Sequence, residues 1–317
     1  MDARPLSAAA AAAITGVQVG ASIVATRFVV EQSAPASLAL LRYAIGLLCL
    51  LPVVLLAGPR PRFAPRDVLP IALLGIAQFG VLIMLLNYAL RVVPSARAAL
   101  IFATFPLLTM LVAAALGAER LTAAKVLGVV VTLAGVGCAL GERALARGGT
   151  GRAWVGELVV FLSALIGAVC SVLYRPYLRR YRALPVSAFA MLASVAFLAV
   201  PAAGEGFFGA LPRFTGAGWL AVLLIGLGSG GGYYLWLWAL DHASPTEVTV
   251  FLALSPITAT LLGGALLGEA VSRLIWLGVA LVTLGLALAT AGIGGPETAP
   301  KPPPLGAPRR SRGVPRC

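Results

Sequence analysis

Long apolar segments follow one another along almost the whole chain, separated by short breaks rich in proline, glycine or charge. A helix needs about 20 apolar residues to cross the hydrocarbon core of a bilayer. Ten segments meet this length, and none shows the alternation of a membrane β-barrel strand. The predicted membrane-spanning helices cover residues 8–30, 35–57, 68–90, 94–116, 121–141, 153–175, 184–203, 216–240, 245–267 and 271–293.

The breaks carry the residues that end one helix and begin the next. Examples are residues 32–35, 58–62, 93–95 and 243–245, each of which contains proline. The first apolar segment continues to Val30, which is longer than the apolar region of a cleaved signal sequence. We therefore predict that this segment is an uncleaved helix.

Composition supports a membrane protein. Apolar residues make up 60% of the chain without counting glycine, and charged residues only 11%, against about 25% in a soluble protein. So few charges argue against a soluble enzyme, a nucleic-acid-binding domain and a disordered protein. The net charge of +13 does not indicate a nucleic-acid partner, because the basic residues lie in short segments between apolar runs. The expected partners are the lipid bilayer and a small-molecule substrate.

The distribution of Lys and Arg predicts the orientation in the membrane. If the N-terminus is inside, 15 basic residues fall in inside segments and 8 in outside segments. Cytoplasmic loops carry the excess of Lys and Arg. Both termini are therefore predicted to be cytoplasmic, in the inner membrane of a bacterium. Residues 294–317, rich in proline and basic residues, are predicted to form a disordered tail.

The chain resembles itself at a spacing of 150 residues, without gaps. Matching proline, glutamate and glycine in one register is harder to obtain by chance than matching leucines. The pairs are Pro35 and Pro185, Pro106 and Pro256, Glu119 and Glu269, Gly128 and Gly278, and Gly135 and Gly285. We predict a first five-helix repeat over 8–141 and a second over 153–293. Because five is odd, the second repeat enters the membrane inverted, as in transporters that alternate access to a central site.

These paired residues, with Leu-Gly-Ala-Glu (116–119) and Leu-Leu-Gly-Glu (266–269), resemble the EamA-type branch of the drug/metabolite transporter (DMT) superfamily. The resemblance implies an all-α integral membrane protein of ten helices, arranged as two inverted five-helix repeats around a central cavity. It also implies cytoplasmic termini and transport of small metabolites, often amino acids or their derivatives and frequently outward.

Arg42 is the clearest candidate for a substrate contact. A charged side chain within a span is costly and indicates function by default. Arg42 is predicted to bind an anionic substrate group or to pair in a gate. The alternative is a packing arginine that extends to the outer interface. Leu192 stands at the matching position of the second repeat, so symmetry lends Arg42 no support.

The acidic residues have structural alternatives. Glu247 is predicted to act in gating or proton coupling, but a carboxylate at a helix start is also favoured by the helix dipole. Glu157 has the same alternative. Glu119 and Glu269 end the fourth and ninth predicted helices, and we expect them to bond backbone donors of the next helix.

Neutral polar and aromatic residues complete the predicted site. The predicted substrate-binding residues are Arg42, Gln18, Gln78, Asn87, Tyr88, Tyr174, Tyr233, Tyr234 and Trp238. For Trp236 and Trp238, the alternative is an aromatic belt at the membrane interface. The glycine run 228–232 predicts either a local helix break or close helix packing. Pro106 and Pro256 are predicted to kink their helices and to serve as hinges.

No metal site or cofactor is predicted. The only histidine is His242, no Cys-x-x-Cys occurs, and no phosphate-binding loop is present. These features favour a secondary transporter, with efflux as the expected direction, and leave proton coupling and oligomeric state open. The alternatives are an uptake permease and a non-transporting membrane subunit. A membrane enzyme is disfavoured because no acid–base set is evident.

Overall fold

The computed structural model describes residues 4–56, 63–117, 122–145, 153–210 and 212–290 of the 317. All regular elements in these ranges are helical. They are α1 (Arg4–Val29), α2 (Pro35–Leu56), α3 (Pro65–Gly75), η1 (Ile76–Val81), α4 (Leu82–Ala89), α5 (Ser95–Phe102), α6 (Phe105–Ala115), α7 (Ala123–Leu145), α8 (Ala153–Leu178), α9 (Ala183–Gly204), α10 (Gly216–His242), α11 (Pro245–Val250), η2 (Phe251–Ala253), α12 (Leu254–Leu267) and α13 (Arg273–Thr290).

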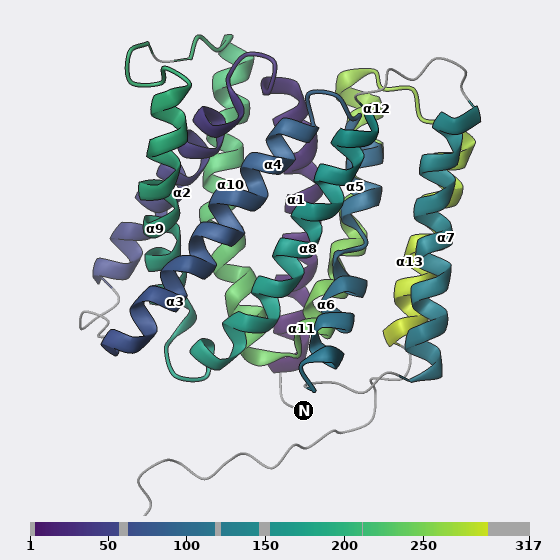
Figure 1. The fold of residues 1–317 in the computed structure, drawn as a ribbon, viewed down its shortest axis with the longest axis horizontal. Helices are drawn as coiled ribbons and strands as arrows, with labels where there is room; N and C mark the ends of the chain where they lie inside the picture. The colour runs from purple at the N-terminus through teal and green to yellow at the C-terminus, as the bar shows by residue number, and fades with distance from the viewer. Residues whose placement is uncertain (1–3, 57–62, 118–121, 146–152, 211, 291–317) are drawn as a thin grey trace, which may run out of the picture.

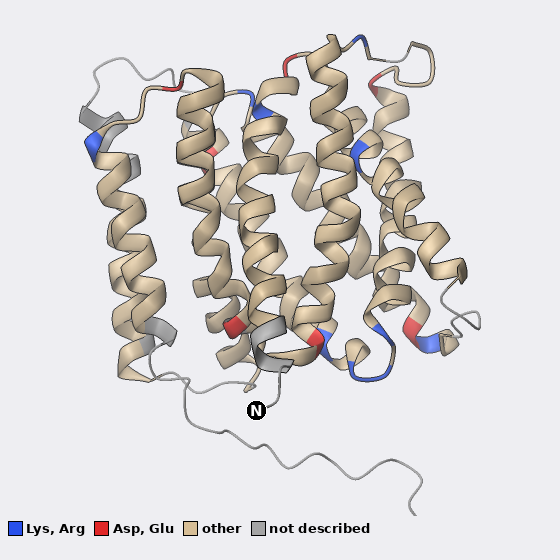
Figure 2. Cartoon of the chain, turned by 180° about the vertical axis from the view of Figure 1, so that it is seen from behind, with Lys and Arg blue, Asp and Glu red and all other residues tan. Residues whose placement is uncertain are grey.

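The helices lie side by side and run between two ends of one bundle (Figure 1). Charged residues gather at those two ends, and the middle of the bundle is almost free of charge (Figure 2). Within the described residues, eight helical segments are long and apolar enough to cross a bilayer, and two shorter apolar helices cover Val126–Cys138 and Arg273–Leu288. The chain is therefore an integral membrane protein.

The helices begin and end within a few residues of the predicted breaks. Pro35 and Pro245 each open a helix, at a position where the missing N–H has no intrahelical partner to lose. Three of the predicted helices are interrupted. The third contains the π-helix η1, and the fourth and ninth are broken into two parts.

The breaks in the fourth and ninth helices lie just ahead of Pro106 and Pro256. The fourth helix is interrupted at residues 103–104, between α5 and α6, and the ninth at η2. Each proline therefore stands in the first turn of the following helix rather than in mid-helix, where it would remove a backbone hydrogen bond. The predicted distortion is present, and it takes the form of a break before the proline.

The glycine run 228–232 does not break its helix, so of the two alternatives predicted for it the local break is wrong. Helix α10 is continuous, and its glycines allow close packing instead. A Cβ on Gly230 would lie 2.7 Å from the carbonyl oxygen of Gly46 on α2. The two backbones approach too closely for any side chain between them, which is the second role expected for such glycines.

Helices α7 and α13 form a pair at one side of the bundle (Figure 1). A Cβ on Gly135 would lie 2.7 Å from the carbonyl oxygen of Gly278, and a Cβ on Gly285 would lie 2.6 Å from that of Gly128. In the repeat of 150 residues, Gly135 corresponds to Gly285 and Gly278 corresponds to Gly128. The first contact therefore becomes the second when the two helices are exchanged. The pair therefore has an approximate twofold relation at its crossing.

Two glutamates bind the starts of distant helices. Glu269 accepts hydrogen bonds from the backbone N–H and hydroxyl of Ser95 at the start of α5, at 3.0 and 2.6 Å. Glu205 accepts from the N–H groups of Ala36 and Ser37 at the start of α2, at 3.0 and 2.7 Å. Glu269 thus binds backbone donors as predicted, but on α5 and not on the next helix, α13. Glu119 and the tail 294–317 lie outside the described residues.

Candidate functional site

A central cavity of about 100 Å³ lies among the helices of both halves of the chain. Helix α1 provides the longest stretch of its wall, and α2, η1, α4, α5, α6, α10 and η2 provide the rest. The lining residues are Thr15, Gln18, Val19, Ser22, Ile23, Thr26, Arg42, Tyr43, Gln78, Phe79, Leu82, Ile83, Leu86, Phe102, Phe105, Ser229, Gly232, Tyr233, Trp236 and Leu252. We call this space the central cavity.

Arg42 is the only charged residue in this wall, and it is 8% exposed. Its Nε donates a hydrogen bond to Ser229 Oγ at 2.6 Å, and its guanidinium carbon lies 5.6 Å from the centre of the Tyr43 ring. Among the described residues, no carboxylate lies within ion-pair distance of Arg42. A buried cation without a counter-ion is costly, so an anionic ligand would stabilise it.

Gln18 and Ser22 form a polar pair on the α1 side of the cavity. Gln18 Nε2 donates to Ser22 Oγ at 2.8 Å, one helical turn further along. The amide lies against α10, where a Cβ on Gly232 would be 2.8 Å from Gln18 Oε1 and a Cβ on Gly228 would be 3.1 Å from Nε2. The absence of side chains at these two glycines makes room for the Gln18 amide.

Gln78 lies within the π-helix η1, where the backbone departs from the regular α-helical bonding pattern. Such bulges occur often at functional sites. Its side-chain oxygen is buried and has no hydrogen-bond partner among the described residues. A buried acceptor of this kind is expected to receive a hydrogen bond from a ligand or a water molecule.

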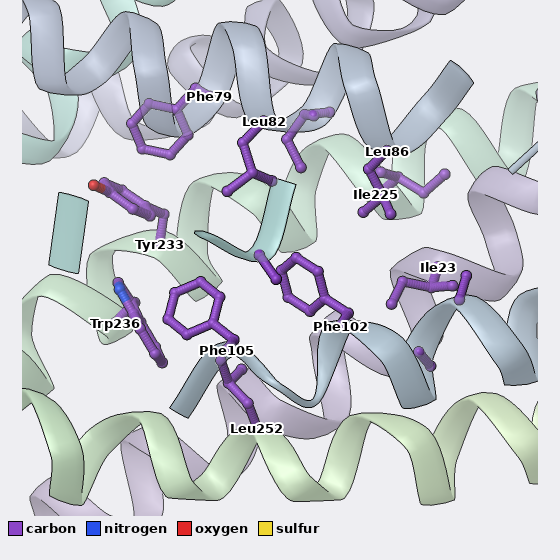
Figure 3. Close-up of a cluster of buried hydrophobic side chains, with 14 of the residues drawn as sticks. Ile23, Phe79, Leu82, Leu86, Phe102, Phe105, Ile225, Tyr233, Trp236 and Leu252 are labelled. Carbon is purple, nitrogen blue, oxygen red and sulfur yellow. The ribbon is translucent and has the colours of Figure 1, made fainter. Parts of the chain in front are cut away.

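An aromatic cluster forms the apolar wall (Figure 3). Phe79, Phe105, Tyr233 and Trp236 turn toward one another from η1, α6 and α10. The ring centres of Phe79 and Tyr233 are 4.0 Å apart, edge to face, and those of Phe105 and Trp236 are 6.0 Å apart. Edge-to-face pairs of this kind are favourable and hold their rings in place.

Four of the nine predicted binding residues line the cavity together, namely Arg42, Gln18, Gln78 and Tyr233. The other five do not line it. They are Tyr174, which is buried with its ring centre 6.5 Å from that of Tyr233; Asn87, whose amide donates to the carbonyl of Pro35; exposed Tyr88; half-buried Tyr234; and Trp238, which stacks on His242.

The acidic candidates lie away from the cavity. Glu247 forms a capping box with Ser244, in which the backbone N–H of each residue donates to the other side chain, at 2.8 and 3.2 Å. Glu157 pairs with Arg97 at 3.6 Å near the start of α8. The capping box matches the structural alternative for Glu247, whose gating or coupling role stays a prediction, whereas the ion pair of Glu157 is a contact that was not predicted.

Ser229 and Trp236 line the cavity but are not among the predicted binding residues. Their spacing from Tyr233 could have indicated this, because Ser229 lies four residues before Tyr233 and Trp236 three residues after it. Residues at these spacings share one face of a helix. The wall as a whole combines one cation, a few neutral polar groups and many apolar rings. This combination suits a small anion that carries an apolar side chain.

Known proteins similar to this chain point to one family. The sequence model of the EamA-like transporter family matches residues 6–141 and 154–291. A probable terminal-alkyne amino-acid exporter of Streptantibioticus cattleyicolor is 32% identical over 71% of this chain and 74% of its own length. The aromatic amino acid exporter YddG of Ancylobacter novellus is 32% identical over 58% of this chain and 70% of its own.

A solved protein crystal structure has the same fold. It superposes with a TM-score of 0.69 at 27% sequence identity, covering 89% of this chain and 96% of its own. The segments matched by the family model, the similar transporters and the long apolar helices all indicate a membrane transporter. The chain belongs to the EamA-like transporter family of the DMT superfamily, and it is an integral membrane transporter.

Proposed function

We propose that this protein is a secondary transporter that exports amino acids or their derivatives across the cytoplasmic membrane by alternating access. In this proposal the substrate carboxylate binds Arg42, and the apolar part of the substrate packs against the aromatic cluster around Tyr233. Gln78 accepts a hydrogen bond from the substrate ammonium group.

One observation carries this proposal: the buried Arg42 guanidinium faces a cavity and has no carboxylate partner among the described residues. A substrate carboxylate would supply the missing counter-ion, and hydrogen bonds between charged groups are the strong ones. Two relatives that are named as amino-acid exporters support the same substrate class and direction.

Two similar halves are a common basis of alternating access, and we propose ten spanning helices in two inverted repeats. The repeat in the sequence, the two matched segments of the family model and the exchanged glycine contacts of α7 and α13 support this arrangement. Two inverted halves can exchange conformations, so that one cavity opens to either side in turn. The described cavity wall contains no Asp or Glu, so we place any proton coupling outside it.

The test is counterflow of labelled phenylalanine in proteoliposomes, compared between the wild-type protein and Arg42→Ala. Loss of a charged hydrogen bond of about 1.5–3 kcal/mol predicts an increase of at least about tenfold in the half-saturating concentration. Arg42→Lys, which keeps the charge but not the planar fork, is expected to be intermediate. Phenethylamine, which lacks the carboxylate, is expected to compete poorly.

The matched control is Arg66→Ala, because the Arg66 side chain is 79% exposed at the start of α3. This variant is expected to behave as wild type. Absence of counterflow for every amino acid would favour a non-transporting subunit. Accumulation against a gradient in the inward direction would favour an uptake permease.

A further inference from the structure

A second hollow, larger than the central cavity, lies beside it. It has a volume of about 660 Å³ and is lined by α1, α10 and α12. Its lining residues are Gln18, Ala21, Ser22, Val24, Ala25, Phe28, Ala217, Leu220, Ala221, Leu224, Ile225, Leu262, Leu266 and Leu267. We call it the lateral groove.

The lateral groove lies within the membrane-spanning part of the bundle. It follows α1 from Gln18 to Phe28, a rise of about 15 Å at 1.5 Å per residue. Leu220 and Leu224 on its α10 side are 59% and 61% exposed, so the groove lies at the lipid-facing surface of the bundle. Apart from the Gln18–Ser22 end, every lining side chain is apolar.

Gln18 and Ser22 line both the lateral groove and the central cavity. Their single side-chain hydrogen bond, 2.8 Å long, is therefore at the boundary between the two spaces. The amide of Gln18 rests on the bare backbone of α10 at Gly228 and Gly232, and Ser22 is its one side-chain hydrogen-bond partner among the described residues. The Gln18 side chain therefore lies where the two spaces adjoin.

The volumes show why the two spaces should act together. The central cavity, at about 100 Å³, is smaller than ordinary ligand pockets of about 300–1,000 Å³, so it suits a head group and a compact side chain against the aromatic cluster but not a long side chain. An amino acid with its head group at Arg42 must place a long side chain elsewhere. The lateral groove is the adjoining space, it is apolar, and it begins at the same two residues.

We propose that the lateral groove binds the hydrocarbon side chain of an amphipathic amino acid whose carboxylate is held by Arg42, with Gln18 and Ser22 as the passage between them. This inference rests on the proposed function and specifies its substrate class: straight-chain α-amino acids with long aliphatic side chains. The same groove gives such side chains a route along the lipid-facing side of the bundle.

The experiment uses the full-length protein in proteoliposomes. Labelled norvaline counterflow is inhibited by straight-chain α-amino acids from alanine to 2-aminodecanoic acid. In wild type, we expect the half-inhibiting concentration to fall with each added methylene, by up to about fourfold, through burial of apolar surface. Leu220→Trp, which fills the groove from an exposed position, is expected to abolish this gain, so that the half-inhibiting concentrations of the longer chains stay close to that of norvaline.

The matched control is Leu227→Trp. Leu227 is on the same helix and 50% exposed, but it does not line the groove. Leu227→Trp is expected to keep the wild-type chain-length dependence. Long-chain amino acids partition into lipid equally in both assays, so a difference between the two tryptophan variants does not come from partition. Identical chain-length profiles for the two tryptophan variants would overturn the inference.

Two further outcomes separate the remaining possibilities. Retention of a phospholipid by wild type but not by Leu220→Trp, with chain-length dependence unchanged, would assign the groove to membrane lipid and overturn the inference. If wild type transports norvaline in an Arg42-dependent manner without any chain-length dependence, the inference fails and the proposed function stands. If no amino acid is transported, both fail.

Discussion

At the scale of single residues, the environment of Arg42 depends on one serine. Ser229 Oγ accepts from Arg42 Nε at 2.6 Å and donates to the carbonyl of Ile225, also at 2.6 Å. The Ser229 hydroxyl therefore holds the guanidinium on the wall of the cavity. The hydroxyl proton itself is bonded to the Ile225 carbonyl within α10. This arrangement leaves the other nitrogens of the guanidinium available to a ligand.

Ser229→Ala is expected to destabilise the protein by about 1–3 kcal/mol, because it leaves a buried charged donor without its partner. The thermal unfolding midpoint in detergent should fall, and the half-saturating concentration of substrate should rise as Arg42 loses its fixed orientation. The matched control is Ser187→Ala, because Ser187 is also buried and donates to a carbonyl four residues earlier, with no cation bound. Equal midpoints for the two variants would contradict this account.

Residue chemistry explains which site residues could be predicted. Arg42, Gln18 and Gln78 stand out in the sequence because polar side chains are rare in apolar spans. Ser229 does not, since serine bonded to its own helix is common in membranes. For Trp236, an interfacial belt remained as the alternative, because tryptophan also prefers that location. Only the tertiary structure shows that it contacts Phe105 in the interior.

At the scale of elements, Glu269 connects two distant helices. It follows Gly268, whose positive φ of 63° ends α12 and turns the chain toward α5. Glycine adopts this conformation without the cost that a side chain adds. The carboxylate then satisfies donors at the start of α5 that have no partner within that helix.

Glu269→Ala is expected to lower the free energy of unfolding by about 1–2 kcal/mol, the usual cost of losing a helix cap. Thermal denaturation in detergent would measure the change. Glu31→Ala is the control, because Glu31 is 69% exposed and Arg27 lies within 4.0 Å of both Glu31 and Glu269. Each variant removes one carboxylate near Arg27, so the difference between them reports the loss of the cap. A Glu269→Ala protein as stable as the Glu31→Ala protein would show that the cap does not stabilise the fold.

The helices themselves could be predicted, but their internal breaks and long-range contacts could not. Length and apolar content determine where a helix spans a bilayer, and prolines such as Pro35 and Pro245 mark its start. The π-helix η1 leaves no mark in the hydrophobic pattern. The partner of Glu269 lies 174 residues away in the sequence, and such a contact depends on how the helices pack.

At the scale of the whole molecule, polar contacts join the two halves of the chain at both ends of the bundle. At one end Glu205 and Glu269 bind the starts of α2 and α5. At the other end Asp67, at the start of α3, accepts a hydrogen bond from the Tyr181 hydroxyl at 2.7 Å. In the proposed alternating-access cycle, the contacts of one end must break while those of the other hold.

The proposed orientation of the chain in the membrane can be tested at the two ends of α9. Arg179 precedes this helix, Phe208 follows it, and both residues are exposed. With cytoplasmic termini, the basic segment that contains Arg179 lies inside and Phe208 outside. In a protein whose native cysteines are replaced, Phe208→Cys should react with a membrane-impermeant maleimide in intact cells. Arg179→Cys should react only after permeabilisation. The reverse pattern would invert the proposed orientation, and labelling of both in intact cells would mean that α9 does not cross the membrane.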